Sequence, residues 1–97
     1  MFRHVSALTF SADATEEQVD EVVAALLELP SQIPQLRSYV VGRDAGLAEG
    51  NADLVIVADC DDVDGYLAYR DHPVHQQVLA ERIRPILAAR TAIQHDL

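Results

Sequence analysis

His75 is the side chain of this sequence whose type and position best suit acid–base chemistry. Helical spacing places it on an apolar stripe, whose members are His75, Val78, Leu79, Ile83 and Ile86. A partly buried imidazole that titrates near neutrality can remove a proton from a carbon next to a carbonyl. The ring can instead satisfy backbone groups at a helix start, where the helix dipole lowers its proton affinity. Both interpretations remain open from the sequence.

His4 is the second candidate, because it shares one face of a predicted strand with apolar neighbours. Residues 2 to 10 alternate well enough to indicate a strand, with five side chains on that face: Phe2, His4, Ser6, Leu8 and Phe10. A polar ring on an apolar face needs either a hydrogen-bond partner or a pocket. If His4 lies near His75, the two rings would form one site.

Metal, nucleophilic and cofactor sites are less well supported by the sequence. His4, His72, His75 and an aspartate have ligand chemistry that suits zinc or iron, but residues three apart at a helix start need not converge. His72 precedes Pro73 and is expected to cap a helix. Cys60 has acidic neighbours that disfavour a thiolate. With no glycine-rich phosphate loop or dinucleotide fingerprint, we expect neither a metal nor a cofactor.

The elements that must position these residues follow from periodicity and from turn signals. Thr15 and Gln18 form a capping box before a helix that Pro30 closes, and Pro85 predicts that the last helix bends or restarts near Arg84. The other predicted elements are strands at 36–43, 53–60 and 91–97 and helices from about 63 to 70 and from 73 onward.

This order predicts an α+β fold, namely one ferredoxin-like domain over residues 1–97. The four-stranded antiparallel sheet would carry its helices on one face. The other face would display Val5, Ala7, Val55 and Val57, which is more apolar surface than a monomer normally leaves in water. A twofold-related copy is the simplest cover, so we expect a homodimer in the form of a dimeric α/β barrel.

The acidic composition of the chain disfavours some classes of binding partner. The 97 residues carry 16 acidic side chains against 7 Lys and Arg, for a formal charge of −9, which disfavours nucleic acids and anionic membranes. No apolar run approaches the roughly 20 residues that cross a bilayer. One cysteine and no signal-peptide pattern at the start predict a cytoplasmic protein.

Nearly the whole chain resembles the stress-responsive dimeric α/β-barrel (Dabb) family. The segment YRDHPVH, from Tyr69 to His75, is similar to the family's Tyr-x-x-His-Pro-x-His signature before the last helix. Arg3-His4 matches the Arg-His of the family's first strand. The likeness also runs through three longer segments: RHVSALTF, ATEEQVDEVVAALLELPSQIPQLRSYVVGRD and ADLVIVADCDDVDGYLAYRDHPVHQQVLAERIRPIL.

The resemblance implies a small hydrophobic pocket between sheet and helices. The family includes the plant polyketide cyclase that makes olivetolic acid, in which the signature tyrosine and second histidine act in an aldol-type ring closure. These roles would fall on Tyr69 and His75, with His4 lining the pocket. Val22 and Leu26 replace bulky aromatics of the cyclase's first helix, so we do not expect the same polyketide substrate.

The leading hypothesis is a homodimer that binds a small apolar or aromatic carbonyl compound in each subunit and promotes an aldol or other proton-transfer step. His75, Tyr69 and His4 are its predicted polar groups, and the predicted walls are Ile56, Leu26, Val22, Ser6 and Leu8. A non-enzymatic stress or assembly protein is the alternative, with its pocket filled by its own side chains. A monooxygenase-like enzyme is a weaker alternative that rests on fold analogy alone.

Overall fold

Strand β1 (Phe2–Phe10) is an inner strand of a four-stranded antiparallel sheet in the computed structural model, which describes residues 1–97. Its neighbours are β3 (Leu54–Cys60) and β4 (Leu87–Asp96), and β2 (Ser38–Arg43) pairs with β3 at the other edge. The strand order is therefore β2-β3-β1-β4. The predicted ferredoxin-like sheet is confirmed.

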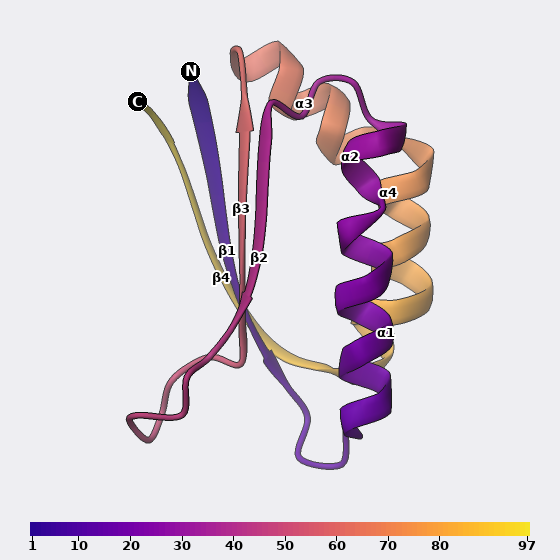
Figure 1. The fold of residues 1–97 in the computed structure, drawn as a ribbon, viewed down its shortest axis with the longest axis vertical. Coiled ribbons are helices and arrows are strands. Elements are labelled where there is room, and N and C mark those ends of the chain that lie inside the picture. The colour runs from indigo at the N-terminus through magenta and orange to yellow at the C-terminus, as the bar shows by residue number, and fades with distance from the viewer.

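The helices all lie on one side of this sheet (Figure 1). They are α1 (Glu16–Leu27), α2 (Leu29–Gln32), α3 (Val63–Asp71) and α4 (Pro73–Val78). The connection between β2 and β3 projects toward the opposite side, away from the helices (Figure 1). None of the helices combines the length and the apolar character that crossing a membrane requires.

The start of α1 follows directly from local side-chain chemistry. Thr15 Oγ1 accepts the Gln18 N–H at 3.1 Å, and Gln18 Oε1 accepts the Thr15 N–H at 2.9 Å, which confirms the capping box. The end differs from prediction, because α1 stops at Leu27 and Pro30 lies in the first turn of α2. A proline is tolerated there because the first-turn N–H has no intrahelical partner.

The last helix changes its winding as it approaches Pro85, which lacks an N–H group. After α4 ends at Val78, η1 (Leu79–Ile83) is a π-helical turn in which the Arg84 N–H bonds to the Leu79 carbonyl. The short η2 (Arg84–Ile86) then tightens to a 3-10 turn. The predicted break near Arg84 is confirmed, and this irregular stretch becomes one wall of the site below.

Strand β4 begins four residues earlier than the predicted start at Thr91. Leu87 pairs with Phe10 while Ala89 pairs with Thr9, so Ala88 is an extra residue in a β-bulge. The bulge breaks the alternation by which a strand is recognised, which is why the prediction missed its beginning. It also turns Arg90 toward the helix-covered face, opposite Leu8.

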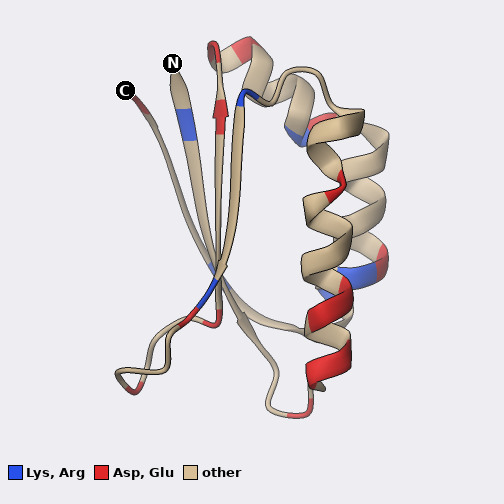
Figure 2. Ribbon diagram, in the orientation of Figure 1, with Lys and Arg blue, Asp and Glu red and all other residues tan.

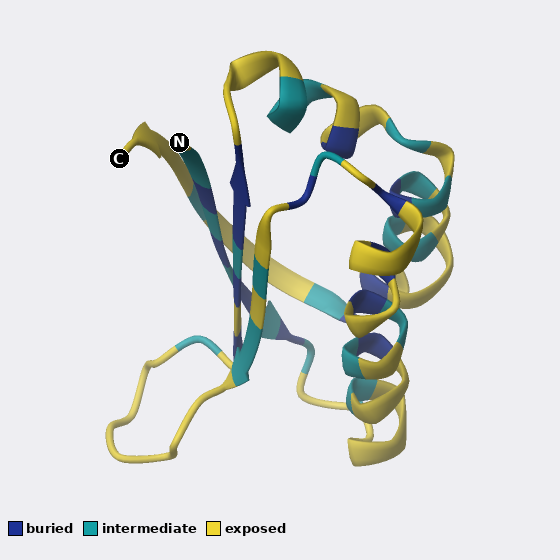
Figure 3. Cartoon of the chain, turned by 45° about the horizontal axis from the view of Figure 1, so that its top comes forward, coloured by how far each residue is buried: buried dark blue, intermediate teal, exposed yellow.

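The two faces of the sheet differ in cover. Fourteen buried apolar residues form one core cluster between sheet and helices, and β4 is exposed over most of its length (Figure 3). On the uncovered face, a row of paired neighbours crosses all four strands: Val40, Val57, Val5 and Ile93. Val55, also on this face, remains 36% exposed, so β3 is fully buried by this chain on one face only.

Acidic residues gather in the N-terminal half of α1, as the red part of that helix in Figure 2 shows. Arg43 at the end of β2 pairs there with Glu16 and Asp20. This surface of α1 accordingly presents mostly negative charge to solvent.

Candidate functional site

His4 is held on β1 by a side chain from β4. The Gln94 amide nitrogen donates to His4 Nδ1 at 2.8 Å, so the neutral ring carries its proton on Nε2. Burial, reinforced by the positive charge of Arg90 and by His75, lowers the His4 pKa from 6.5 to about 4. Near neutral pH His4 is therefore an uncharged ring whose Nε2–H is a donor.

His75 has the opposite tautomer. Its Nδ1–H donates to the Arg70 carbonyl at 2.9 Å at the start of α4, which leaves a lone pair on Nε2. Burial lowers the His75 pKa, and the bond to the Arg70 carbonyl partly opposes that shift. Every fully buried side-chain nitrogen or oxygen has a hydrogen-bond partner. Because Nε2 has none, it keeps access to solvent and can accept a proton.

Tyr69 of α3 connects the two histidines. Its ring centroid lies 4.3 Å from that of His75 and 6.4 Å from that of His4. The Tyr69 hydroxyl is 3.4 Å from the Tyr39 hydroxyl. The ring centroid of Tyr66 lies 5.1 Å from that of His4. Burial raises the Tyr69 pKa to about 12, so the phenol stays protonated. The three predicted polar residues, which come from three different elements, therefore lie in one cluster of aromatic rings.

A hollow of about 240 Å³ lies between the sheet and the η1–η2 stretch, and we call it the inner hollow. Four predicted residues line it: His4, Ser6, Leu8 and Ile56. The remaining lining residues are Leu79, Ile83, Arg84, Leu87 and Arg90. Most of this lining is apolar, as a site for a small hydrophobic compound requires.

The other predicted site residues lie elsewhere. Val22 and Leu26 are at most 1% exposed in the core and do not line the inner hollow. Tyr69, whose ring packs near His4, and His75, which packs against Tyr69, do not line the hollow. Sequence reasoning missed Arg84 and Arg90 in that lining, because the β-bulge hid the strand pattern that would have placed Arg90 opposite Leu8.

The residues considered for metal and thiol chemistry have structural roles. His72 Nδ1 accepts the Val74 N–H at 3.2 Å, which confirms its predicted place as the α4 cap. No three histidine, cysteine or carboxylate side chains come together as a metal site would need. Cys60 is buried, and burial, together with neighbouring aspartates, raises the pKa of its thiol.

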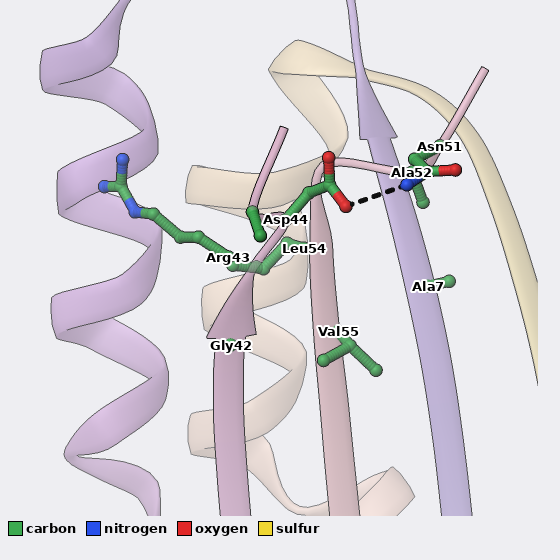
Figure 4. A pocket seen from close by; sticks show the side chains of 9 residues that line it. Ala7, Gly42, Arg43, Asp44, Asn51, Ala52, Leu54 and Val55 are labelled. Carbon is green, nitrogen blue, oxygen red and sulfur yellow. Dashed lines mark hydrogen bonds between the residues drawn. The ribbon is translucent and has the colours of Figure 1, made fainter. Parts of the chain in front are cut away.

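A second hollow, of about 360 Å³, lies on the uncovered face near the β2–β3 connection (Figure 4). Ala7 and Val55 form part of its floor, and Asn51 Nδ2 donates to Asp44 Oδ1 at 3.1 Å at its rim. It contains no histidine, tyrosine or cysteine. Of the two hollows, only the inner hollow is lined by a histidine, namely His4.

Solved structures with the same architecture cover almost all of this chain. A dimeric ferredoxin-like protein of unknown function from Thermobifida fusca is 46% identical, with a TM-score of 0.91 over 99% of this chain and 90% of that one. A dimeric protein of ferredoxin-like fold from Bacteroides fragilis is 21% identical, with a TM-score of 0.80 over 99% and 95%. The hydroxynitrile lyase from Passiflora edulis is 15% identical, with a TM-score of 0.84 over 97% and 90%.

The two less similar structures share the fold alone with this chain, whereas the Thermobifida fusca protein is a sequence relative. No curated protein matches the sequence. The profile of the Stress responsive A/B Barrel Domain matches residues 2–96. The chain therefore belongs to the stress responsive A/B barrel (Dabb) domain family.

Proposed function

We propose that this protein is a homodimer that binds a small apolar or aromatic carbonyl compound in each subunit and promotes a proton-transfer step on it. The observation that carries the proposal is the pairing of two neutral histidines of opposite tautomer around Tyr69. One ring offers a donor and the other a base, which is what enolisation of a carbonyl compound needs.

The proposed step moves one proton between carbon and nitrogen. His75 Nε2 takes a proton from the carbon next to the carbonyl, and the electron pair of that C–H bond moves to the carbonyl oxygen. Because His75 does not line the inner hollow, the step requires the reacting end of the compound to extend past His4 toward the His75 ring. His4 Nε2–H or the Tyr69 hydroxyl donates a hydrogen bond to the developing oxyanion. Attack of the enolate carbon on a second carbonyl group would give the aldol product, and the proton held by His75 would then neutralise the new alkoxide.

Exchange of carbon-bound protons for deuterium tests this step directly. Acetophenone in deuterium oxide, followed by proton NMR, reports loss of its methyl protons without a need to know the natural substrate. We expect exchange to be faster with the wild type than with buffer, and His75→Ala and Tyr69→Phe to lose most of the gain. His95→Ala, on the exposed end of β4, is the matched control. The proton-transfer half of the proposal fails if both site variants exchange acetophenone as fast as the wild type.

Dimerisation is supported by the uncovered apolar face and by the dimeric description of the 46% identical relative. Two such faces packed together would bury Val57 and its neighbours as the core of a barrel. Sedimentation velocity at low micromolar concentration should give the mass of two chains, and a monomer would contradict the proposal. The free, buried Cys60 fits a reducing cytoplasm as the protein's location.

A non-enzymatic assembly protein is the second candidate, favoured by the close packing of Tyr69 and His75, which are 2% and 8% exposed. The inner hollow argues for binding instead, because a space of about 240 Å³ beside His4 is left unfilled by the chain's own side chains. A crystal soaked with small aromatic compounds distinguishes the two. Ligand density in the inner hollow favours binding, and side chains that fill the hollow favour the assembly role.

A further inference from the structure

The arginines of this chain divide into two groups by their contacts. All seven basic residues are arginines, in a chain with 16 carboxylate side chains. Five of them lie within 4 Å of a carboxylate: Arg3, Arg37, Arg43, Arg70 and Arg82. Arg84 and Arg90 form no ion pair and donate no side-chain hydrogen bond. These two are also the arginines that line the inner hollow.

The two side chains reach the hollow from opposite layers. Arg84 comes from η2 on the helix side, and Arg90 comes from β4 on the sheet side. Each position depends on a local irregularity, since Arg84 follows the π turn and Arg90 faces inward because of the bulge at Ala88. Bulges and π turns recur at functional sites, where they redirect particular side chains.

No carboxylate lines this hollow to neutralise the two guanidinium groups, although the whole chain is acidic. The positive charge of Arg90 reaches His4, His75 and Tyr69, because it lowers the pKa of each. Arg84 and Arg90 are the only charged side chains in the lining, and neither has a carboxylate within the 4 Å of an ion pair. The hollow is thus a local cationic site in a protein of net charge −9.

We propose that the ligand of the inner hollow is an organic carboxylate, whose anionic group is held by Arg84 and Arg90 and whose apolar body lies against Leu8 and Ile56. The inference rests on the proposed function and names its substrate class. Planar guanidinium groups match a carboxylate through paired N–H donors. The apolar lining favours a carbon skeleton over a bare inorganic anion.

Benzoate and benzamide form the matched ligand pair, because they share a ring and differ in charge at one substituent. With the wild-type protein near neutral pH, titration calorimetry or NMR should show benzoate binding roughly tenfold or more tightly than benzamide, as expected for charge-assisted hydrogen bonds. Arg84→Gln and Arg90→Gln should each reduce that preference, and the double variant should abolish it. Arg37→Gln, whose arginine pairs with Asp61 outside the hollow, should retain it.

Other outcomes would overturn the inference in distinguishable ways. Equal binding of benzoate and benzamide would contradict the proposal of a carboxylate ligand and leave the proposed binding function intact. If neither compound binds, both the carboxylate ligand and the proposed binding function are contradicted. Inorganic phosphate binding as tightly as benzoate would show an anion site with no need for an apolar body. If Arg84→Gln and Arg90→Gln dissociate the dimer in sedimentation but leave benzoate binding unchanged, the two arginines serve the subunit contact instead.

Discussion

The two faces of the sheet are built from the same strands, but the helices of this chain cover one face and leave the other exposed. On the inner face, His4 and Ser6 are buried next to apolar neighbours, and the helices cover them. On the outer face, Val40 is 52% exposed and Ile93 is 61% exposed, and nothing from this chain covers them. On the inner face the Gln94 amide holds the polar ring of His4, whereas the centre of the outer face carries the apolar row Val40, Val57, Val5 and Ile93.

The inner face is therefore suited to chemistry and the outer face to assembly. Buried polar groups persist only with hydrogen-bond partners, and such a network gives defined tautomers and shifted pKa values. An apolar surface has no directional partners and gains stability simply by leaving water. At one end of the outer face, Arg3 donates two hydrogen bonds of 2.8 Å to Asp59 and lowers the pKa of that carboxyl. This ion pair lies at the margin of the apolar row. We therefore expect substitutions on the outer face to affect the dimer, and substitutions on the inner side to affect the stability of the fold and its pH dependence.

The largest expected effect is on the outer face, from Val57→Asp. An unpaired carboxylate in the centre of a buried apolar interface costs several kcal/mol, so the dimer should dissociate at micromolar concentration or fail to fold. Val63→Asp is the control, since Val63 is 48% exposed at the start of α3. Sedimentation velocity measures both. A Val57→Asp variant that stays dimeric and folded would contradict the covered outer face.

On the inner face, Leu26→Ala should lower the free energy of unfolding by about 2–5 kcal/mol through loss of burial and creation of a cavity. Leu26 is 0% exposed, while the adjacent Leu27 is 56% exposed. Leu27→Ala is therefore the matched control and should change stability by less than about 0.5 kcal/mol. Urea unfolding at one protein concentration measures the difference. Equal losses for the two variants would contradict the assigned core.

A smaller effect is expected from Ile93→Ser at the β4 edge of the outer face. If the second copy covers the whole row from Val40 to Ile93, loss of this apolar side chain should weaken the dimer by roughly tenfold. Leu27→Ser, which is similarly exposed on the helix side, should leave the dissociation constant unchanged. An unchanged constant for Ile93→Ser would place the edge of the covered area between β1 and β4.

The smallest expected effect is a pH dependence from the inner face. Because the His4 pKa is lowered from 6.5 to about 4, the folded protein resists protonation and the unfolded chain takes up the proton first. His4 thus contributes stability that is complete above pH 6.5 and is lost as pH falls toward about 4. The lowered pKa of His75 acts in the same direction.

His4→Gln should therefore flatten the fall in melting temperature across this pH window while retaining a hydrogen-bonding side chain. Ser6→Ala, a nontitrating change on the same face of β1, is the control and should keep the wild-type slope. Thermal melts at a series of pH values measure it. A slope that is the same in His4→Gln and in the wild type would contradict a neutral, buried His4.

Much of the fold was predictable because its signals are local in sequence. Alternation placed β1 and β3 with the correct faces, the Thr15–Gln18 pair located the start of α1, and Pro85 marked the break in the last helix. The beginning of β4 was missed because Ala88 interrupts its alternation. A bulge is set by pairing with a strand that lies far away in the chain, so local patterns do not reveal it.

Only those residues of the candidate site that lie on regular strands could be predicted from the sequence. His4, Ser6, Leu8 and Ile56 lie where strand alternation puts them, around one hollow. Val22 and Leu26 were predicted as walls because they occupy the positions of the bulky aromatics on the cyclase's first helix, but here they lie in the solid core. Periodicity distinguishes inside from outside, but it does not distinguish a filled interior from a cavity.

The sequence by itself determined most of the elements, apart from α2 and the start of β4, and the apolar faces of the sheet, because two-residue and helical periodicities are properties of neighbouring residues. It also determined the family through its signature segment. Tertiary structure alone decided the tautomer of His4 and the placement of Arg84 and Arg90 around one hollow. These depend on contacts between distant segments, such as Gln94 with His4 and the bulged pairing of β4 with β1. Those contacts form only when the sheet and the helices pack together.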